Sequence, residues 1–159
     1  MTINDNGPRP NAFNIATATR QNENYRTVAW TGKYLQVTLM HVPVGESIGL
    51  EVHPATDQFL RLEAGHGTAV MGPAKDTLDF TQDVSAGWSI QIPAGIWHDV
   101  INSGDVPLRV YVVYAPVHHA AGVVQATGAE AERDELAGAD EPPAWTIQPR
   151  HGAPDGHAS

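Results

Sequence analysis

Cysteine is absent from this chain of 159 residues, and lysine occurs at only two positions. Without cysteine the chain can form neither a disulfide nor a thiolate metal site, so any metal must be bound by oxygen and nitrogen atoms. Nine Lys and Arg residues against 18 Asp and Glu residues leave a net charge of −9. This balance argues against nucleic-acid binding, because a phosphate backbone is bound by a basic surface.

Long apolar runs are missing as well. No run approaches the roughly 20 apolar residues that a membrane-spanning helix needs. The N-terminal residues 1–8 have neither the basic start nor the apolar core of a secretory signal. We therefore expect a cytoplasmic protein that does not bind membranes.

What the chain does contain is a series of short β-strand patterns. Its charged fraction of 17% favours β-structure over long surface helices. Segments with period-two alternation recur roughly every 8 to 12 residues between Gly and Pro turns, which is typical of a closed or sandwiched all-β domain. The predicted strands cover residues 25–30, 34–42, 50–53, 57–63, 68–71, 79–84, 88–92, 97–101 and 108–114.

The composition changes on both sides of this β-rich region. Residues 1–24 are predicted to form an N-terminal arm, which contains a short helix or an extended segment. The β-rich domain spans residues 25–116. Residues 117–159 form a C-terminal extension with a short helix over residues 128–136, and the Pro, Gly and Ala content after residue 138 indicates loop or disorder.

Side chains that can bind a metal lie in two glycine-bounded stretches, residues 45–65 and 87–102. Glu51 and His53 are two positions apart on a predicted strand and therefore share one face. His98 lies in the second stretch, directly after a Pro-Ala-Gly turn. One carboxylate with two imidazoles suits Fe(II), Mn(II), Ni(II) or Zn(II).

Two neighbouring residues compete for a place beside these three. Gln58 shares a strand face with Leu60 and Leu62, whereas Asp57 lies on the more polar face that carries Arg61 and Glu63. Because apolar side chains mark the buried face of a strand, this parity favours Gln58 as the inward-facing residue.

The second stretch resembles the second motif of the cupin superfamily. That motif is a glycine, five residues, Pro-x-Gly, two residues, His, three residues and Asn. All of its defined positions are matched here, by Gly87, Pro93, Gly95, His98 and Asn102.

The first stretch is similar to the first cupin motif in spacing but departs from it in two residue types. Glu51 stands where the family usually has its first histidine, and His53 matches the second. With a four-residue spacer, Gln58 takes the place of the family's glutamate and Gly65 falls in register. With a three-residue spacer Asp57 takes that place, and no glycine is in register.

The resemblance implies a single jelly-roll β-barrel with a divalent transition metal, Mn, Fe, Ni or Zn, held by four side chains: Glu51, His53, Gln58 and His98. The amide at position 58 is a weaker donor than a carboxylate, so we expect looser binding than in a typical cupin site. The alternative is a metal-free pocket in which Glu51 and Gln58 hydrogen-bond each other. The stretch around residues 49–61 is also similar to bacterial cupins labelled mannose-6-phosphate isomerase-like, which points to sugar-like substrates.

Three functions fit this pattern. The first is a metal-dependent isomerase, lyase or dioxygenase acting on a small polar, sugar-like or keto-acid-like molecule, with Glu51 and His98 as catalytic residues. The second is a non-catalytic small-molecule binder. The third is a metal-free acid–base enzyme that uses Glu51 and a histidine.

Further residues are assigned by their position on the predicted strands. Gln36, Thr38 and Met40 share the polar face of one strand, and Tyr111 lies on the last long strand, so these four are predicted to line the substrate pocket. Arg26, Lys33 and Arg61 are the few cations near the predicted barrel. One of them could bind a substrate carboxylate or phosphate, and for each a surface ion pair is the favoured interpretation. His118 and His119 are expected to point to opposite faces and not to form a joint metal site. The resemblance also implies a homodimer, with residues 25–30 as a candidate pairing strand.

Overall fold

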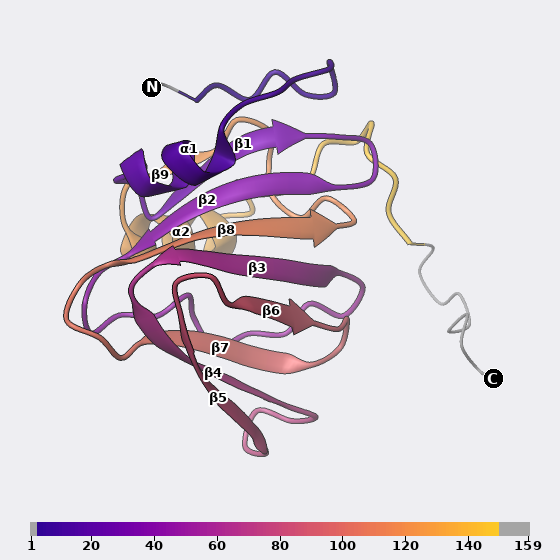
Figure 1. Ribbon diagram of the computed structural model, residues 1–159. Helices are drawn as coiled ribbons and strands as arrows, with labels where there is room; N and C mark the ends of the chain where they lie inside the picture. The colour runs from indigo at the N-terminus through magenta and orange to yellow at the C-terminus, as the bar shows by residue number, and fades with distance from the viewer. Residues whose placement is uncertain (1–2, 150–159) are drawn as a thin grey trace.

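The computed structural model describes residues 3–149 and shows nine strands arranged in two antiparallel sheets (Figure 1). The prediction of an all-β fold is therefore confirmed. The strands are β1 (Arg26–Thr31), β2 (Gln36–Val42), β3 (Asp57–Ala64), β4 (His66–Gly72), β5 (Phe80–Ser85), β6 (Ser89–Ile92), β7 (Trp97–Asn102), β8 (Leu108–Ala115) and β9 (Val124–Gln125).

The larger sheet has six strands in the order β6-β3-β8-β2-β1-β9, and the smaller sheet has three in the order β5-β4-β7. In Figure 1 the larger sheet runs from β1 at the top down to β6, and the smaller sheet lies below it. The sheets remain two separate hydrogen-bonded units. Only isolated bridges, such as the one between Glu51 and His98, join the segment before β3 to the smaller sheet within residues 3–149.

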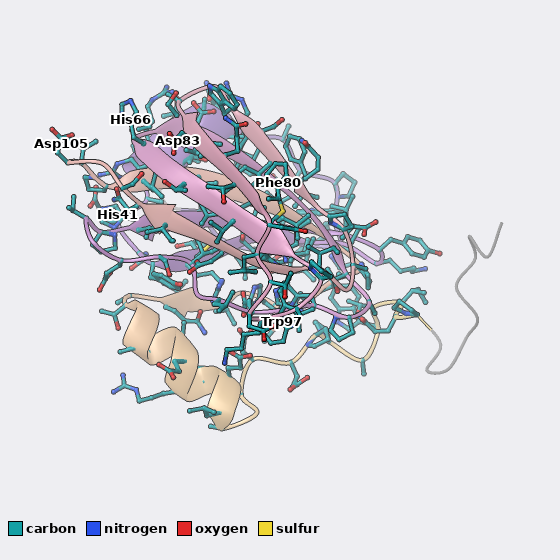
Figure 2. All side chains as sticks on the ribbon, turned by 90° about the horizontal axis from the view of Figure 1, so that it is seen from below. His41, His66, Phe80, Asp83, Trp97 and Asp105 are labelled. Atoms are coloured by element: carbon teal, nitrogen blue, oxygen red, sulfur yellow. The ribbon has the colours of Figure 1, made fainter. Side chains whose placement is uncertain are left out.

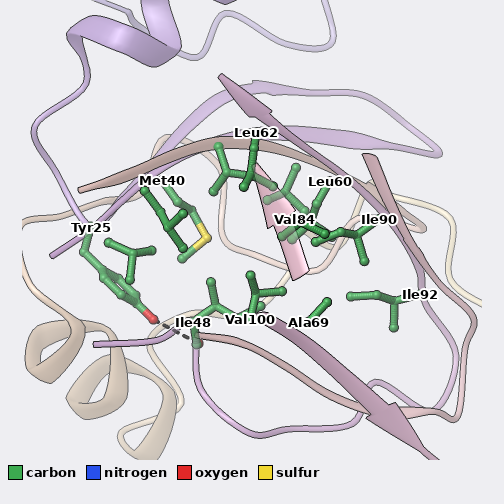
Figure 3. Close-up of a cluster of buried hydrophobic side chains, with 14 of the residues drawn as sticks. Tyr25, Met40, Ile48, Leu60, Leu62, Ala69, Val84, Ile90, Ile92 and Val100 are labelled. Atoms are coloured by element: carbon green, nitrogen blue, oxygen red, sulfur yellow. Dashed lines mark hydrogen bonds between the residues drawn. The ribbon is translucent and has the colours of Figure 1, made fainter. Parts of the chain in front are cut away.

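The main core lies between the two sheets, where alternate residues of β2, β3, β4, β6 and β8 point inward (Figure 3). Leu60 and Leu62 of β3 are fully buried, and they meet Ala69 of β4 and Val100 of β7 in this core. Tyr25 closes one end of the core, and its hydroxyl donates a hydrogen bond of 2.9 Å to the carbonyl oxygen of Ile48. This bond ties the start of β1 to the loop that leads to Glu51.

A second cluster covers the outer face of the larger sheet. The helix α1 (Ile15–Gln21) begins at Asn14, whose side chain accepts a hydrogen bond from the backbone N–H of Thr17. Its Ala18 packs with Ala29 of β1 and Leu39 of β2, and Tyr111 of β8 packs against this cluster. The N-terminal arm therefore contains a helix, which was one of the two expected forms.

The C-terminal extension contains the predicted helix, α2 (Gly128–Leu136). Thr127 and Glu130 cap its first turn reciprocally, since the Thr127 hydroxyl accepts from the Glu130 N–H and the Glu130 carboxylate accepts from the Ala126 N–H. Viewed from below, α2 stands beside the sheets (Figure 2). The chain after α2 is held by hydrogen bonds, including one from the Ile147 N–H to the Lys33 carbonyl. The expected disorder concerns residues 138–159, of which 150–159 lie outside the described residues.

One predicted strand is wrong. Residues 50–53 form a single bridge at Glu51 and no extended pairing. Gly49 has a φ of +102°, which turns the backbone just before this segment, and Pro54 begins the next turn. The two-residue strand β9 was missed because so short a segment carries no readable alternation. No helix within residues 3–149 is both long and apolar enough to cross a membrane.

Candidate functional site

Glu51 and His98 are brought together by backbone pairing at the end of the smaller sheet. The Glu51 N–H donates to the His98 carbonyl at 3.1 Å, and the His98 N–H donates to the Glu51 carbonyl at 2.9 Å. Such directly opposed residues hold their side chains next to each other. His98 is therefore fixed at the inner side of β7, with 1% of its surface exposed.

His53 completes a compact group with these two residues. One donor atom from each of Glu51, His53 and His98 lies within 4.8 Å of the others. The Glu51 carboxylate is 3.3 Å from His53 Nε2, and the centroids of the two imidazole rings are 5.3 Å apart. These distances allow all three side chains to bind one cation.

Gln58 reaches the same group from β3. Its amide nitrogen lies 3.2 Å from His98 Nε2, while His98 Nδ1 lies 3.0 Å from the carbonyl oxygen of Ile96. Because a carbonyl oxygen can only accept, His98 carries its proton on Nδ1 and turns the lone pair of Nε2 inward. Asp57 is exposed, and its carboxylate accepts the backbone N–H of Ala94 instead. The structure thus places Gln58 inside and Asp57 on the exposed face at the start of β3.

The charges of this group suit a cation. Burial raises the pKa of Glu51, but the neighbouring His53 and Arg26 outweigh burial and hold that pKa below its usual value. Burial lowers the pKa of His98, so this imidazole is neutral at pH 7. An ionised carboxylate and an imidazole with an inward-facing lone pair are the form in which these groups bind metals.

An unpartnered atom marks the same place. His53 Nε2 is buried and makes no well-formed hydrogen bond among residues 3–149, and the Glu51 carboxylate lies 3.3 Å from it. A buried polar nitrogen without a partner costs about 1 to 3 kcal/mol. A cation bound by Glu51, His53 and His98 would remove that cost, so the residues present fit a metal.

His118 also belongs to this neighbourhood, and sequence reasoning missed it. Its ring centroid lies 4.1 Å from that of His53 and 5.6 Å from that of Tyr114. The chain bends after β8 and does not continue as a strand, so the rings of His118 and His119 lie 4.8 Å apart and not on opposite faces. A proline at position 116, directly after β8, was the available signal for that bend.

Gln36 fixes this bent segment. Its side-chain oxygen accepts the N–H groups of His118 at 3.3 Å and His119 at 2.8 Å, and its side-chain nitrogen donates to the His119 carbonyl at 2.9 Å. Gln36 has no exposed surface. It was predicted to line the substrate pocket, and the structure gives it a supporting position behind the histidines.

The other three residues predicted to line the pocket lie on two different faces of the larger sheet. Thr38 and Met40 point inward as expected, but both are buried, and Met40 belongs to the main core. Tyr111 packs against α1 in the outer cluster, so the prediction that it lines the pocket is wrong. Tyr114, on the opposite face of β8, is the tyrosine near the site, with its ring centroid 6.3 Å from that of His53.

A cavity of about 990 Å³ opens beside Glu51. It lies between the strands and the C-terminal extension, and residues from β1, the loop before Glu51, α2 and the segment after α2 line it. Arg26, His118 and His119 line its inner part. Among the labelled residues of Figure 2, His41 and His66 lie towards the opposite end of the strands from Trp97, which precedes His98.

His119 and Asp140 form a buried pair at this cavity. His119 Nδ1 donates to Asp140 at 2.7 Å, and the other Asp140 oxygen accepts the N–H of Ala120 at 2.9 Å. Burial lowers the pKa of His119 to about 4 despite this partner. Burial acts to raise the pKa of Asp140, but the hydrogen bond from His119 prevails and lowers it to about 2. Nothing in the sequence indicated this pair, because residue 140 lies in a stretch expected to be loop or disorder.

Comparison with known proteins finds relatives along most of the chain. The family described as "Cupin domain" matches residues 38–114. The uncharacterized protein YrkC of Bacillus subtilis (strain 168) is 50% identical over 131 residues, covering 82% of this chain and 70% of that protein. An uncharacterized protein of Acanthamoeba polyphaga mimivirus is 38% identical over 112 residues, covering 70% of this chain and 68% of that protein.

The solved structure of BH2720 from Bacillus halodurans is similar as well. It is 49% identical, with a TM-score of 0.82, and the match covers 82% of this chain and 99% of that chain. The family match over residues 38–114 and the similarity in fold therefore agree.

Proposed function

Because this chain belongs to the cupin superfamily, we propose that it is a metal-dependent enzyme that acts on a small polar molecule. The metal would be held by Glu51, His53 and His98, with the amide oxygen of Gln58 as a weak fourth donor after rotation of the amide. The observation that carries the proposal is the buried, unpartnered His53 Nε2 beside an ionised carboxylate and a neutral imidazole.

A divalent transition metal in this position would supply Lewis acidity towards a carbonyl or hydroxyl oxygen, or a binding position for dioxygen if it is iron. The protein's own residues would orient the ligand and move protons. The Glu51 side chain is 30% exposed towards the cavity and ionised, so it can accept a proton from a bound molecule. His98 is held in one tautomer by Ile96, which keeps its Nε2 directed at the site.

The reaction class that we propose is isomerase, lyase or dioxygenase chemistry on a sugar-like or keto-acid-like substrate. A metal-free acid–base enzyme is the second candidate. The hydrogen bond from Gln58 to His98 Nε2 favours it, because that bond occupies the lone pair a metal would need. A non-catalytic binder would use the same cavity without turnover.

Metal analysis separates these candidates. The protein would be produced in medium containing Mn, Fe, Ni and Zn, purified without chelator, and analysed by mass spectrometry of the elements. We expect about one metal ion per chain in the wild type and none in the double variant His53→Ala, His98→Ala. His66→Ala is the matched control, since His66 is exposed and lies at the far end of β4. Wild-type metal content in the double variant would show that the metal site is elsewhere.

A further inference from the structure

Arg26 is a buried cation without an acidic partner. It projects from β1 into the lining of the large cavity, and 7% of its surface is exposed. Its Nη1 donates to the side-chain oxygen of Gln125 at 2.9 Å, and its Nε has no partner among residues 3–149. No Asp or Glu oxygen in that part of the chain lies within the 4.0 Å of an ion pair with Arg26.

The groups that surround Arg26 leave its charge in place. Burial raises the pKa of both Tyr25 and Tyr114 to about 12, so neither phenol is ionised at pH 7. Gln125 is a neutral amide, and its own nitrogen donates to Asp134 at 3.0 Å, which puts that carboxylate one residue further away.

Two acidic residues attract Arg26 across the cavity, and each has another residue as its nearer partner. Glu51 faces His53, and Asp140 accepts hydrogen bonds from His119 and Ala120. A buried cation is costly unless an anion or hydrogen-bond acceptors meet it. Arg61, by contrast, forms an ion pair with Glu63, so its charge is already balanced within the protein.

We infer that Arg26 binds the carboxylate of a small monoanionic ligand in the cavity between the strands and α2. A guanidinium meets a carboxylate through two parallel hydrogen bonds, which makes arginine the usual residue for this task. The inference rests on the proposed function, since it names the substrate class of the same site. It selects the keto-acid-like class over neutral sugars.

The rim of the cavity limits the charge of the ligand. Glu46, Glu132, Glu135 and Glu141 are exposed and line the same cavity. A ligand with two or more negative charges would meet one cation and several carboxylates, so repulsion from the rim would oppose its entry. A ligand with one carboxylate places its charge on Arg26, at the inner part of the cavity, and leaves its uncharged part towards Glu51.

Calorimetric titration with pyruvate tests the inference. Pyruvate carries one carboxylate next to a carbonyl, and pyruvamide is its uncharged counterpart of nearly the same shape. We expect pyruvate to bind the metal-free wild type at least about tenfold more tightly than pyruvamide and more tightly than the dianion malonate. Arg26→Gln is expected to weaken pyruvate binding at least about tenfold without changing pyruvamide binding. Arg61→Gln removes the same charge from the same barrel and is expected to bind pyruvate like the wild type.

Arg26→Lys guards against loss of folding in the glutamine variant, because lysine keeps the charge but not the fork of two donors. It is expected to fall between the wild type and Arg26→Gln. Circular dichroism shows whether each variant is folded. Three results would each overturn the inference. The first is that folded Arg26→Gln or Arg26→Lys binds pyruvate as tightly as the wild type does. The others are that the wild type binds pyruvate and pyruvamide equally, or that it binds no pyruvate at 10 mM.

The titration and the elemental analysis together separate this inference from the proposed function. Pyruvate binding that depends on Arg26, together with no metal in the wild type purified from metal-containing medium, would retain the carboxylate site and reject the metal-dependent enzyme. Bound metal together with pyruvate binding that ignores Arg26 would do the reverse.

Discussion

Replacing Gln58 by glutamate puts a carboxylate where the amide now faces His98. The Gln58 amide nitrogen lies 3.2 Å from His98 Nε2, so a carboxylate at position 58 would lie within about 4 Å of a metal bound by His98. A divalent cation and a carboxylate at about 4 Å attract by about 8 kcal/mol at an effective dielectric constant of about 20, which is twice the value for two unit charges. Burying the new carboxylate cancels part of this gain, because charged groups lose hydration when buried.

We therefore expect Gln58→Glu to tighten metal binding by about 1.4 to 2.8 kcal/mol, which is about 10- to 100-fold. Competition with a chromogenic chelator for Mn(II) or Zn(II) measures this change. Without metal the new carboxylate faces the ionised Glu51, so the same variant should melt at a lower temperature than the wild type and regain stability when metal is added.

The matched control is Gln91→Glu, which makes the same change on the exposed side of β6. It should leave the metal affinity as in the wild type. An equal gain in both variants would mean that overall charge, and not position 58, determines the affinity. An unchanged or weaker affinity in folded Gln58→Glu would refute the placement of the metal beside residue 58.

Two further predictions rest on single residues of the structure, and a third, a homodimer, rests on the family resemblance. The pKa of His119 is about 4 in the folded protein and 6.5 in the unfolded chain, so between these values the unfolded chain binds a proton that the folded protein does not. The stability that His119 contributes is therefore complete above pH 6.5 and is lost as the pH falls towards 4. We expect the free energy of unfolding to fall by about 2 kcal/mol between pH 7.5 and pH 5. Urea unfolding at both pH values measures it, and a His119→Asn variant with an undiminished pH dependence would contradict it. Tyr25→Phe leaves the buried Ile48 carbonyl without its 2.9 Å donor and should lower the free energy of unfolding by about 1 kcal/mol, and unchanged stability in urea would show that the bond contributes nothing. We also propose a homodimer in solution, which light scattering at micromolar concentration measures; a monomer there would contradict it.

Patterns within a few residues could be predicted from the sequence. Period-two alternation correctly predicted that Gln58 is buried and Asp57 exposed, because successive side chains of a strand point to opposite faces. The same rule places Tyr111 and Tyr114 on opposite faces, but alternation alone does not say which face looks into the barrel. That choice depends on α1, whose packing covers the face of Tyr111.

Contacts between distant parts of the chain could be predicted only where the resemblance to the two motifs supplied them, as for Glu51 and His98. Arg26 meets Gln125 across 99 positions, and His119 meets Asp140 across 21 positions of a segment without strand or helix alternation. Arg26 was interpreted as a surface ion pair because nothing near it in the sequence announces burial. Its surroundings are set by β9 and α2, which follow the other eight strands in the sequence, and β9 pairs with β1.

The three hydrogen bonds between the Gln36 side chain and the backbone of His118 and His119 join two parts of the chain that have different roles. The side chains that would hold a metal all come from residues 51–98, while much of the wall that a ligand meets comes from residues 117–148. A change in the length or composition of the later segment can therefore alter which ligand fits without disturbing the metal-binding side chains. A variant that keeps Gln36 and changes only this segment would therefore keep the metal-binding side chains and change the ligand that it binds.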